Sequence, residues 1–188
     1  MTPGSITHRE IVDFARKNGL QRIHRVLLGH DGSMTNLLEL ITCGSVELRT
    51  LGQKIVPCPE MASRLLQINV FEEVNERDII MVRSSDGYPL LHAKSFTPIS
   101  RLDPTFKSDL MRADIPIGKI LQKHRIESRR ELIDMGLIER DERLSELLRC
   151  KGPYIWRSYN IITRDLPLIT IRETLPTSLY LQPEAESS

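Results

Sequence analysis

Two charged residues interrupt apolar, strand-like stretches of this sequence, and their chemistry suits a small anionic ligand. In PLITIRETLP, residues 167–176, Glu173 shares a strand face with Ile171, because successive strand residues point to opposite faces. The same alternation places Arg77 on the face of Ile79. A guanidinium can bind a carboxylate through two parallel hydrogen bonds, and a glutamate can accept one from a hydroxyl. Together they suggest a pocket for a ligand that carries both groups.

Two simpler interpretations of these charges stand beside that hypothesis. In the first, both side chains end their strands in water. In the second, Arg77 and Glu173 form a buried ion pair with each other. Structural charge networks are common in proteins, so periodicity alone does not separate these interpretations from a ligand pocket.

Two expected helix starts would add backbone donors to such a pocket. In DGSMT, Ser33 suits the N-cap of a helix that starts near Met34. In DIPIG, Pro116 suits the first helical position and brings the amide of Ile117 to the helix start. The first amides of a helix lack partners within the helix and attract anions. Every helix has such amides, so only their convergence with Arg77 would be informative.

Helical patterns flank these residues. Thr7 and Glu10 have capping-box spacing and Gly19 supplies a stop, so residues 8–18 are expected to form a helix. Further helices are expected in RDERLSELLR and at residues 104–112 and 116–123. The stretch ELIDMGL fits a strand or a helix equally well.

Strand patterns make up much of the remaining chain. Val46, Leu48 and Thr50 alternate with polar residues and predict a strand that runs towards Pro57. Asp86-Gly87 separates two strand-like runs and is a strong hairpin signal. YIWRSYNIITRDLPLITIRETLP has a similar arrangement, so two hairpins are expected to join in one antiparallel sheet.

Composition indicates one globular domain. The 188 residues are 40% hydrophobic and 27% charged, with a net charge of +1. We expect a single domain over residues 1–182 and a polar, disordered tail over residues 183–188. The balanced charge argues against broad binding to nucleic acid or to an anionic membrane surface.

The cysteines and histidines give no metal or disulfide signature. Cys43, Cys58 and Cys150 are odd in number and widely spaced, which favours free thiols in a reducing compartment. The histidines show no ligand spacing. No signal peptide and no apolar run of about 20 residues is present, so a cytoplasmic protein is expected.

Four ordered stretches resemble the chorismate pyruvate-lyase family, in particular its archaeal and mycobacterial branch. They are GSMTNLLEL, ERDIIMVRSSDGYPLL followed by FTPIS, ADIPIGKIL, and RSYNIITRDLPLITIRETLP. HRIESRREL, after the third stretch, fits this branch as well. The resemblance spans about residues 20–180, and its specificity lies in the ordered set.

The resemblance implies an α+β fold, with one antiparallel sheet, helices on one side and helical flaps over a buried ligand. It implies removal of pyruvate from chorismate to give 4-hydroxybenzoate. In the family, residues matching Arg77 and the amides of Met34 and Ile117 bind the ring carboxylate, and the residue matching Glu173 meets the ring hydroxyl. Ile117 stands where some members carry leucine.

The chemistry of this reaction requires no metal, redox cofactor or covalent nucleophile. We expect Arg77 to hold the ring carboxylate, while Glu173 either acts as a general base or only orients the substrate. In the second case the proton passes within the substrate to the enolpyruvyl methylene. Arg157 is a further candidate for the pyruvyl carboxylate, against the alternative of a surface arginine beside Trp156 and Tyr159.

A non-catalytic function is the alternative. The same fold serves as the UTRA effector-binding domain of GntR-type regulators, which also has an R-x-Y…P…E pattern near its end. The sequence before residue 20 is too short for a winged-helix DNA-binding domain, which favours the enzyme. The oligomeric state and the pathway that uses the product are not encoded in any pattern of the sequence.

Overall fold

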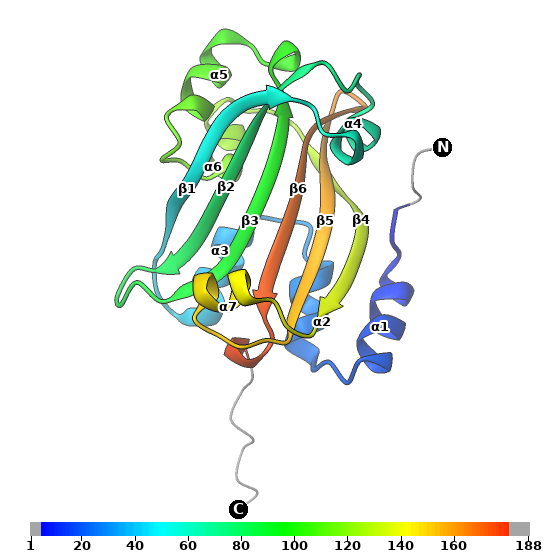
Figure 1. The fold of residues 1–188 in the computed structure, drawn as a ribbon, viewed down its shortest axis with the longest axis vertical. Coiled ribbons are helices and arrows are strands. Elements are labelled where there is room, and N and C mark those ends of the chain that lie inside the picture. The colour runs from blue at the N-terminus through cyan, green and yellow to red at the C-terminus, as the bar shows by residue number, and fades with distance from the viewer. Residues whose placement is uncertain (1–4, 181–188) are drawn as a thin grey trace, which may run out of the picture.

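A six-stranded antiparallel sheet forms the centre of the computed structural model, which describes residues 5–180 (Figure 1). The predicted tail, residues 183–188, lies outside the described residues. The strand order is β1-β2-β3-β6-β5-β4. The strands are β1 (Val46–Pro57), β2 (Glu73–Arg83), β3 (Pro89–Pro98), β4 (Arg129–Ile138), β5 (Tyr154–Thr163) and β6 (Leu166–Pro176).

Seven α-helices accompany the sheet within the described residues. They are α1 (His8–Lys17), α2 (Arg22–Gly29), α3 (Met34–Thr42), α4 (Glu60–Leu66), α5 (Pro104–Met111), α6 (Ile117–Lys123) and α7 (Glu142–Leu148). Five of them lie where the sequence predicts helices, whereas α2 and α4 were not predicted. None of the helices in residues 5–180 is long and apolar enough to cross a membrane.

The helix starts follow the capping chemistry. Thr7 and Glu10 form the predicted capping box of α1. Ser33 caps α3 by accepting a hydrogen bond from the amide of Asn36. Helix α6 begins at Ile117, one residue later than predicted, because Pro116 occupies the cap position with an extended backbone.

Both predicted hairpins form and join in the sheet. β2 and β3 pair around Asp86 and Gly87, and Gly87 has a φ of 66°, which glycine adopts without steric cost. β5 and β6 form the second hairpin. β3 pairs with β6, so that Ala93 lies opposite Glu173. The ambiguous stretch ELIDMGL is a strand within β4, which pairs with β5.

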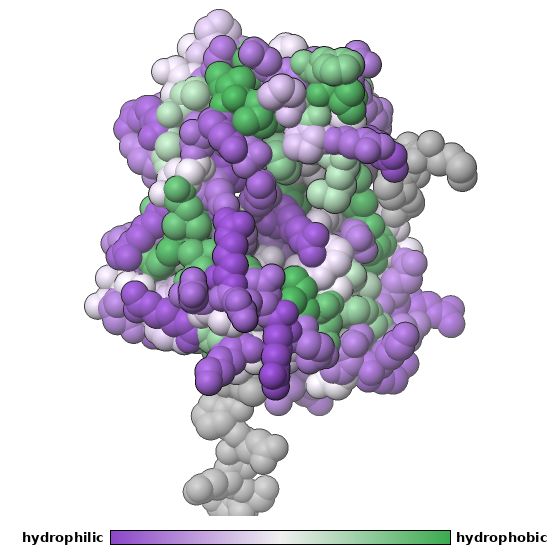
Figure 2. Space-filling model, viewed as in Figure 1, coloured by the Kyte–Doolittle hydropathy of each residue, from purple (hydrophilic) through white to green (hydrophobic). Residues whose placement is uncertain are grey.

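Most helices cover one face of the sheet, as expected, and two short ones lie over the other. Helices α2, α3, α5 and α6 lie behind the sheet in Figure 1, whereas α4 and α7 lie in front of its two ends. Between α4 and α7 the front face is open, and Figure 2 shows mainly hydrophilic side chains there. Polar contacts cross its strands, including the ion pair of Lys94 with Glu76 and the hydrogen bond between His92 and Asp78.

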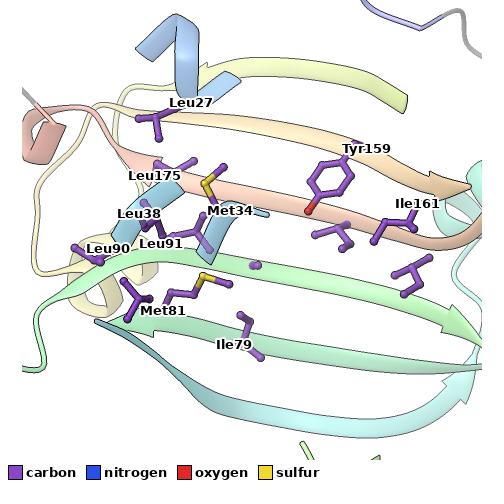
Figure 3. Close-up of a cluster of buried hydrophobic side chains, with 14 of the residues drawn as sticks. Leu27, Met34, Leu38, Ile79, Met81, Leu90, Leu91, Tyr159, Ile161 and Leu175 are labelled. Atoms are coloured by element: carbon purple, nitrogen blue, oxygen red, sulfur yellow. The ribbon is translucent and has the colours of Figure 1, made fainter. Parts of the chain in front are cut away.

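The main hydrophobic core lies between the covered face and its helices. Leu27 from α2 and Leu38 from α3 are fully buried in this cluster, and Leu27 lies beside β5 (Figure 3). Met34 lies beside them, and Tyr159 and Ile161 from β5 lie further along the sheet. At that point apolar packing gives way to polar side chains, including Arg77 and Glu173.

Candidate functional site

A cavity lies on the covered face of the sheet, where charged residues replace part of the apolar core. The cavity has a volume of about 60 Å³. Its floor comes from all six strands, with β4 contributing Arg130. Its cover comes from two closing segments, residues 31–35 before and at the start of α3 and residues 115–118 at the start of α6. The lining side chains that bear on function are Ser33, Met34, Arg77, Ile117, Arg130, Tyr159 and Glu173.

Arg77 presents an unpaired guanidinium edge inside the protein. Its side chain is 2% exposed, and Nη1 donates to the carbonyl of Ile115 over 2.9 Å. Nε and Nη2 are buried and have no hydrogen-bond partner among residues 5–180. Burial lowers the pKa of Arg77, and the charge of Asp114 opposes that shift only in part. Two parallel donors are therefore free for a planar anion.

Glu173 is also buried, but both of its oxygens are occupied. Oε2 accepts a hydrogen bond from Nε of Arg157 over 2.7 Å, and Oε1 accepts one from the hydroxyl of Tyr159 over 2.9 Å. Burial raises the pKa of Tyr159, so this phenol stays protonated and acts as the donor. Each carboxylate oxygen has a further lone pair that can accept a ligand hydroxyl.

Arg157 lies behind Glu173 and not among the residues that line the cavity. It faces Glu173 across β5 and β6, and Nη1 donates to the carbonyls of Leu28 and His30. Burial alone would lower the pKa of Arg157, but the adjacent Glu173 raises it overall. The interpretation of Arg157 as a surface arginine is wrong, because it is 1% exposed.

Both simpler interpretations of Arg77 and Glu173 are also wrong. The side chains do not lie in water at strand ends, because they are 2% and 3% exposed. They do not pair with each other, because the ion-pair partner of Glu173 is Arg157. Arg77 lies opposite Ser95, and Glu173 lies opposite Ala93 of the same strand. Standard strand spacings separate the Cα atoms of Arg77 and Glu173 by about 12 Å.

The structure also brings Met34 and Ile117 to this cavity. Each is the first residue of its helix, so its amide lacks a partner within that helix. The carbonyl that Arg77 binds, that of Ile115, belongs to the same closing segment as Ile117. The four predicted residues Met34, Arg77, Ile117 and Glu173 therefore line one cavity.

Two lining residues were not predicted as parts of the site. Tyr159 was noted only as a neighbour of Arg157, although it shares the strand parity of Arg157 and Ile161. The second is Arg130, which belongs to the mixed-charge stretch RIESRRELID and whose side chain lines the cavity. Strand parity could have indicated this, because Arg130 lies two residues before the apolar Leu132 on β4 and so shares its face. Among residues 5–180, His, Cys, Asp and Glu side chains form no group of three suited to a metal.

The fold, in which helices cover one face of an antiparallel sheet, is shared with solved structures. PhnF from Mycobacterium smegmatis has a similar structure, with a TM-score of 0.66 and 14% identity over 95% of this chain and 90% of that one. The ligand-binding domain of a GntR-family regulator from Bordetella bronchiseptica has a TM-score of 0.61 and 16% identity, covering 76% and 92%. At such identities the likeness shows the fold alone.

The sequence comparison gives the family. The family model described as "Chorismate pyruvate-lyase Rv2949c-like" matches residues 27–181. The protein named "Putative lyase MJ0807" from Methanocaldococcus jannaschii is 34% identical over 174 residues, which are 89% of this chain and 85% of that protein. The chain belongs to the Rv2949c-like chorismate pyruvate-lyase family, which confirms the predicted resemblance and the predicted α+β fold class.

Proposed function

We propose that this protein is a chorismate pyruvate-lyase that converts chorismate into 4-hydroxybenzoate and pyruvate. The observation that carries the proposal is the open Nε and Nη2 edge of Arg77, buried in a cavity whose other end holds Glu173. A buried, unpaired guanidinium is unfavourable unless a ligand supplies the missing charge. Chorismate has a ring carboxylate and a ring hydroxyl on opposite sides of its ring, which matches the two ends of the cavity.

In the proposed complex, Arg77 and the amides of Met34 and Ile117 hold the ring carboxylate. Glu173 accepts the hydrogen bond of the ring hydroxyl and so fixes the carbon that loses a proton. The apolar side chains of Ile79, Met81 and Ile171, from the sheet floor, contact the ring face. Holding the reacting groups in one geometry can supply about 7–11 kcal/mol of the barrier.

The reaction breaks the bond between the ring carbon and the ether oxygen of the enolpyruvyl group. The electron pair of that bond leaves with the enolpyruvate, the proton of the hydroxyl-bearing carbon is lost, and the ring becomes aromatic. A proton added to the enolpyruvyl methylene completes pyruvate. It arrives either directly from the ring carbon or through Glu173, whose carboxylate Arg157 and Tyr159 hold in place.

A non-catalytic binding module is the second candidate. It is favoured by the similarity of the fold to the ligand-binding domain of a GntR-family regulator. In such a module Arg77 and Glu173 would hold a hydroxylated aromatic acid without converting it.

One assay separates the two candidates. Purified protein is mixed with chorismate, and 4-hydroxybenzoate absorbance and pyruvate are followed together, with Arg77→Met as the matched inactive control. Equal formation of both products by the wild type alone supports the lyase. If neither product forms while 4-hydroxybenzoate still raises the melting temperature, the lyase proposal fails and the binding module stands.

A further inference from the structure

A second guanidinium lines the cavity from the side opposite Arg77. Arg77 lies on β2, whereas Arg130 lies on β4 at the far edge of the sheet, opposite Ile161. Arg130 is half-buried, and its Nη1 donates to the carbonyl of Asp31 over 3.0 Å. Nε is buried, and neither Nε nor Nη2 has a hydrogen-bond partner among residues 5–180. Arg130 therefore also has an edge without partners, although only its Nε is buried, whereas both Nε and Nη2 of Arg77 are.

Arg130 lies where the two closing segments meet. Its Nη1 binds the first segment at Asp31, and its Nη2 lies 3.9 Å from the position that a Cβ would take on Gly118 in the second. The same Cβ position on Gly118 is 3.8 Å from Oγ of Ser33, so the two segments touch beside Arg130. A ligand group bound to Arg130 would thus contact both parts of the cover.

The charge of Arg130 acts inside the cavity. Burial raises the pKa of Tyr159, Glu173 raises it further, and the charges of Arg157 and Arg130 oppose the rise. Tyr159 is 5% exposed and lies next to Leu132, the residue two positions after Arg130 on β4. No carboxylate among residues 5–180 forms an ion pair with Arg130, unlike its neighbour Arg129, which pairs with Glu131 and Asp165.

We propose that Arg130 binds a second carboxylate of the substrate and holds this departing carboxylate where the two closing segments meet. The site therefore selects dicarboxylates over monocarboxylates. This inference rests on the proposed function and specifies its substrate class. The ring carboxylate goes to Arg77 and the enolpyruvyl carboxylate goes to Arg130. After cleavage each arginine holds the carboxylate of one product, and pyruvate lies where the closing segments meet.

The test compares two stable ligands that differ only in the second charge. 3-(Carboxymethoxy)benzoate carries a ring carboxylate and an ether-linked carboxylate, and 3-propoxybenzoate replaces the latter with an apolar group of similar size. Dissociation constants are measured by titration calorimetry for the wild type and for Arg130→Gln, Arg130→Lys and Arg129→Gln. Arg129 is the matched control, because it is the adjacent residue, points to the other face and is exposed.

The wild type is expected to prefer the dicarboxylate by about tenfold or more, which corresponds to one or two charge-assisted hydrogen bonds. Arg130→Gln should remove this preference, Arg130→Lys should retain part of it, and Arg129→Gln should leave it unchanged. Loss of affinity for both ligands alike would assign Arg130 to holding Asp31 in place and overturn the proposal. A wild type without preference for the dicarboxylate also overturns it.

Catalysis gives an independent readout. With chorismate, Arg130→Gln should raise KM at least tenfold while inhibition by 4-hydroxybenzoate stays unchanged, since that product lacks the second carboxylate. If the wild type prefers the dicarboxylate but does not convert chorismate, the lyase proposal fails and the assignment of Arg130 stands. If it converts chorismate and Arg130→Gln leaves both KM and ligand preference unchanged, only the assignment of Arg130 fails.

Discussion

Arg77 and Glu173 are both buried, yet the protein pairs one charge and leaves the other open. Glu173 has a permanent ion pair with Arg157 and a hydrogen bond from Tyr159. Arg77 has one carbonyl partner, Ile115, and two buried donors without partners among the described residues. The carboxylate is therefore held in position before a ligand binds, whereas the guanidinium gains most of its hydrogen bonds from the ligand.

Replacement of Arg77 by methionine should stabilise the free protein and abolish binding. Buried donors without partners each cost about 1–3 kcal/mol, so Arg77→Met should raise the free energy of unfolding by about 1 kcal/mol after loss of the Ile115 contact. Affinity for 4-hydroxybenzoate should fall by about a hundredfold or more. Urea denaturation and calorimetry measure the two effects.

Arg83→Met is the control for this variant, because Arg83 lies on the same strand and pairs with Asp86 at the surface. It should change neither the free energy of unfolding nor the free energy of 4-hydroxybenzoate binding by more than a few tenths of a kcal/mol. Destabilisation by Arg77→Met of several kcal/mol would show that Arg77 serves the fold and not a ligand.

Replacement of Glu173 by glutamine should destabilise the protein by about 3–5 kcal/mol, because Arg157 would keep a buried charge without a counter-charge. The double variant Arg157→Met/Glu173→Gln should lose less stability than the sum of its single variants. Urea denaturation of the four proteins gives the coupling. Strictly additive losses would contradict a structural role of this pair.

The variant Glu173→Gln also tests whether Glu173 takes part in the proton transfer. If Glu173 is the general base, Glu173→Gln should lower kcat at least a hundredfold while product affinity falls much less. An unchanged kcat would assign the proton transfer to the substrate itself and leave Glu173 an orienting role.

At the scale of elements, the cavity depends on how α5 and α6 are tied together. Asp109 of α5 accepts hydrogen bonds from Lys123 at the end of α6 and from His124, which follows it. His124 also packs against Phe106 of α5, with ring centroids 5.5 Å apart. These contacts hold the end of α6 against α5, and we expect them to support the segment at the start of α6 that carries Ile115 and Ile117.

Asp109→Asn should loosen this segment and weaken product binding several-fold. The hydrogen bonds of Lys123 and His124 lower the pKa of Asp109, so its stabilising effect is full above its unfolded-state pKa of about 3.9. The effect is lost as the pH falls through the lower folded-state pKa. The difference in melting temperature between variant and wild type should therefore be present at pH 7 and become smaller as the pH falls below the unfolded-state value of about 3.9.

Lys119→Gln, at an exposed position of α6, is the control for Asp109→Asn and should leave the melting temperature unchanged across this pH range. An Asp109→Asn variant that melts like the wild type at pH 7 would show that this cluster does not stabilise the segment.

At the scale of the whole molecule, the two faces of the sheet have different tasks. The front face carries its ion pairs in contact with solvent, and the covered face encloses the cavity beneath the two closing segments. The cavity of about 60 Å³ is smaller than the roughly 300–1,000 Å³ of typical ligand sites. A ligand larger than this cavity requires its lining to move, and we expect the two closing segments to move apart when a ligand enters or leaves.

A disulfide between the closing segments should block this motion. In Ser33→Cys/Gly118→Cys the new side chains would lie close together, because a Cβ on Gly118 lies 3.8 Å from Oγ of Ser33. The oxidised variant should exchange labelled 4-hydroxybenzoate at least tenfold more slowly than the reduced one. The single variants control for the substitutions, and equal exchange in both redox states would rule out this route.

Local patterns predicted much of the fold. The alternation of residues 167–176 and of the Arg77 strand correctly placed Glu173 and Arg77 on a buried face, because strand parity depends only on neighbours in sequence. Capping chemistry predicted α1 and α3, and Asp86-Gly87 predicted the hairpin. The short helices α2 and α4 gave no comparable signal, since tertiary packing and not local propensity stabilises such helices.

The sequence by itself thus determined the faces on which charges lie and, through its ordered stretches, the family. Only the tertiary structure decided which charges meet. The strand order β2-β3-β6-β5-β4 places Arg157 directly opposite Glu173, and it brings Arg77 and Arg130 to two sides of one cavity. These contacts join residues distant in the chain, and their energies depend on burial that no local pattern specifies.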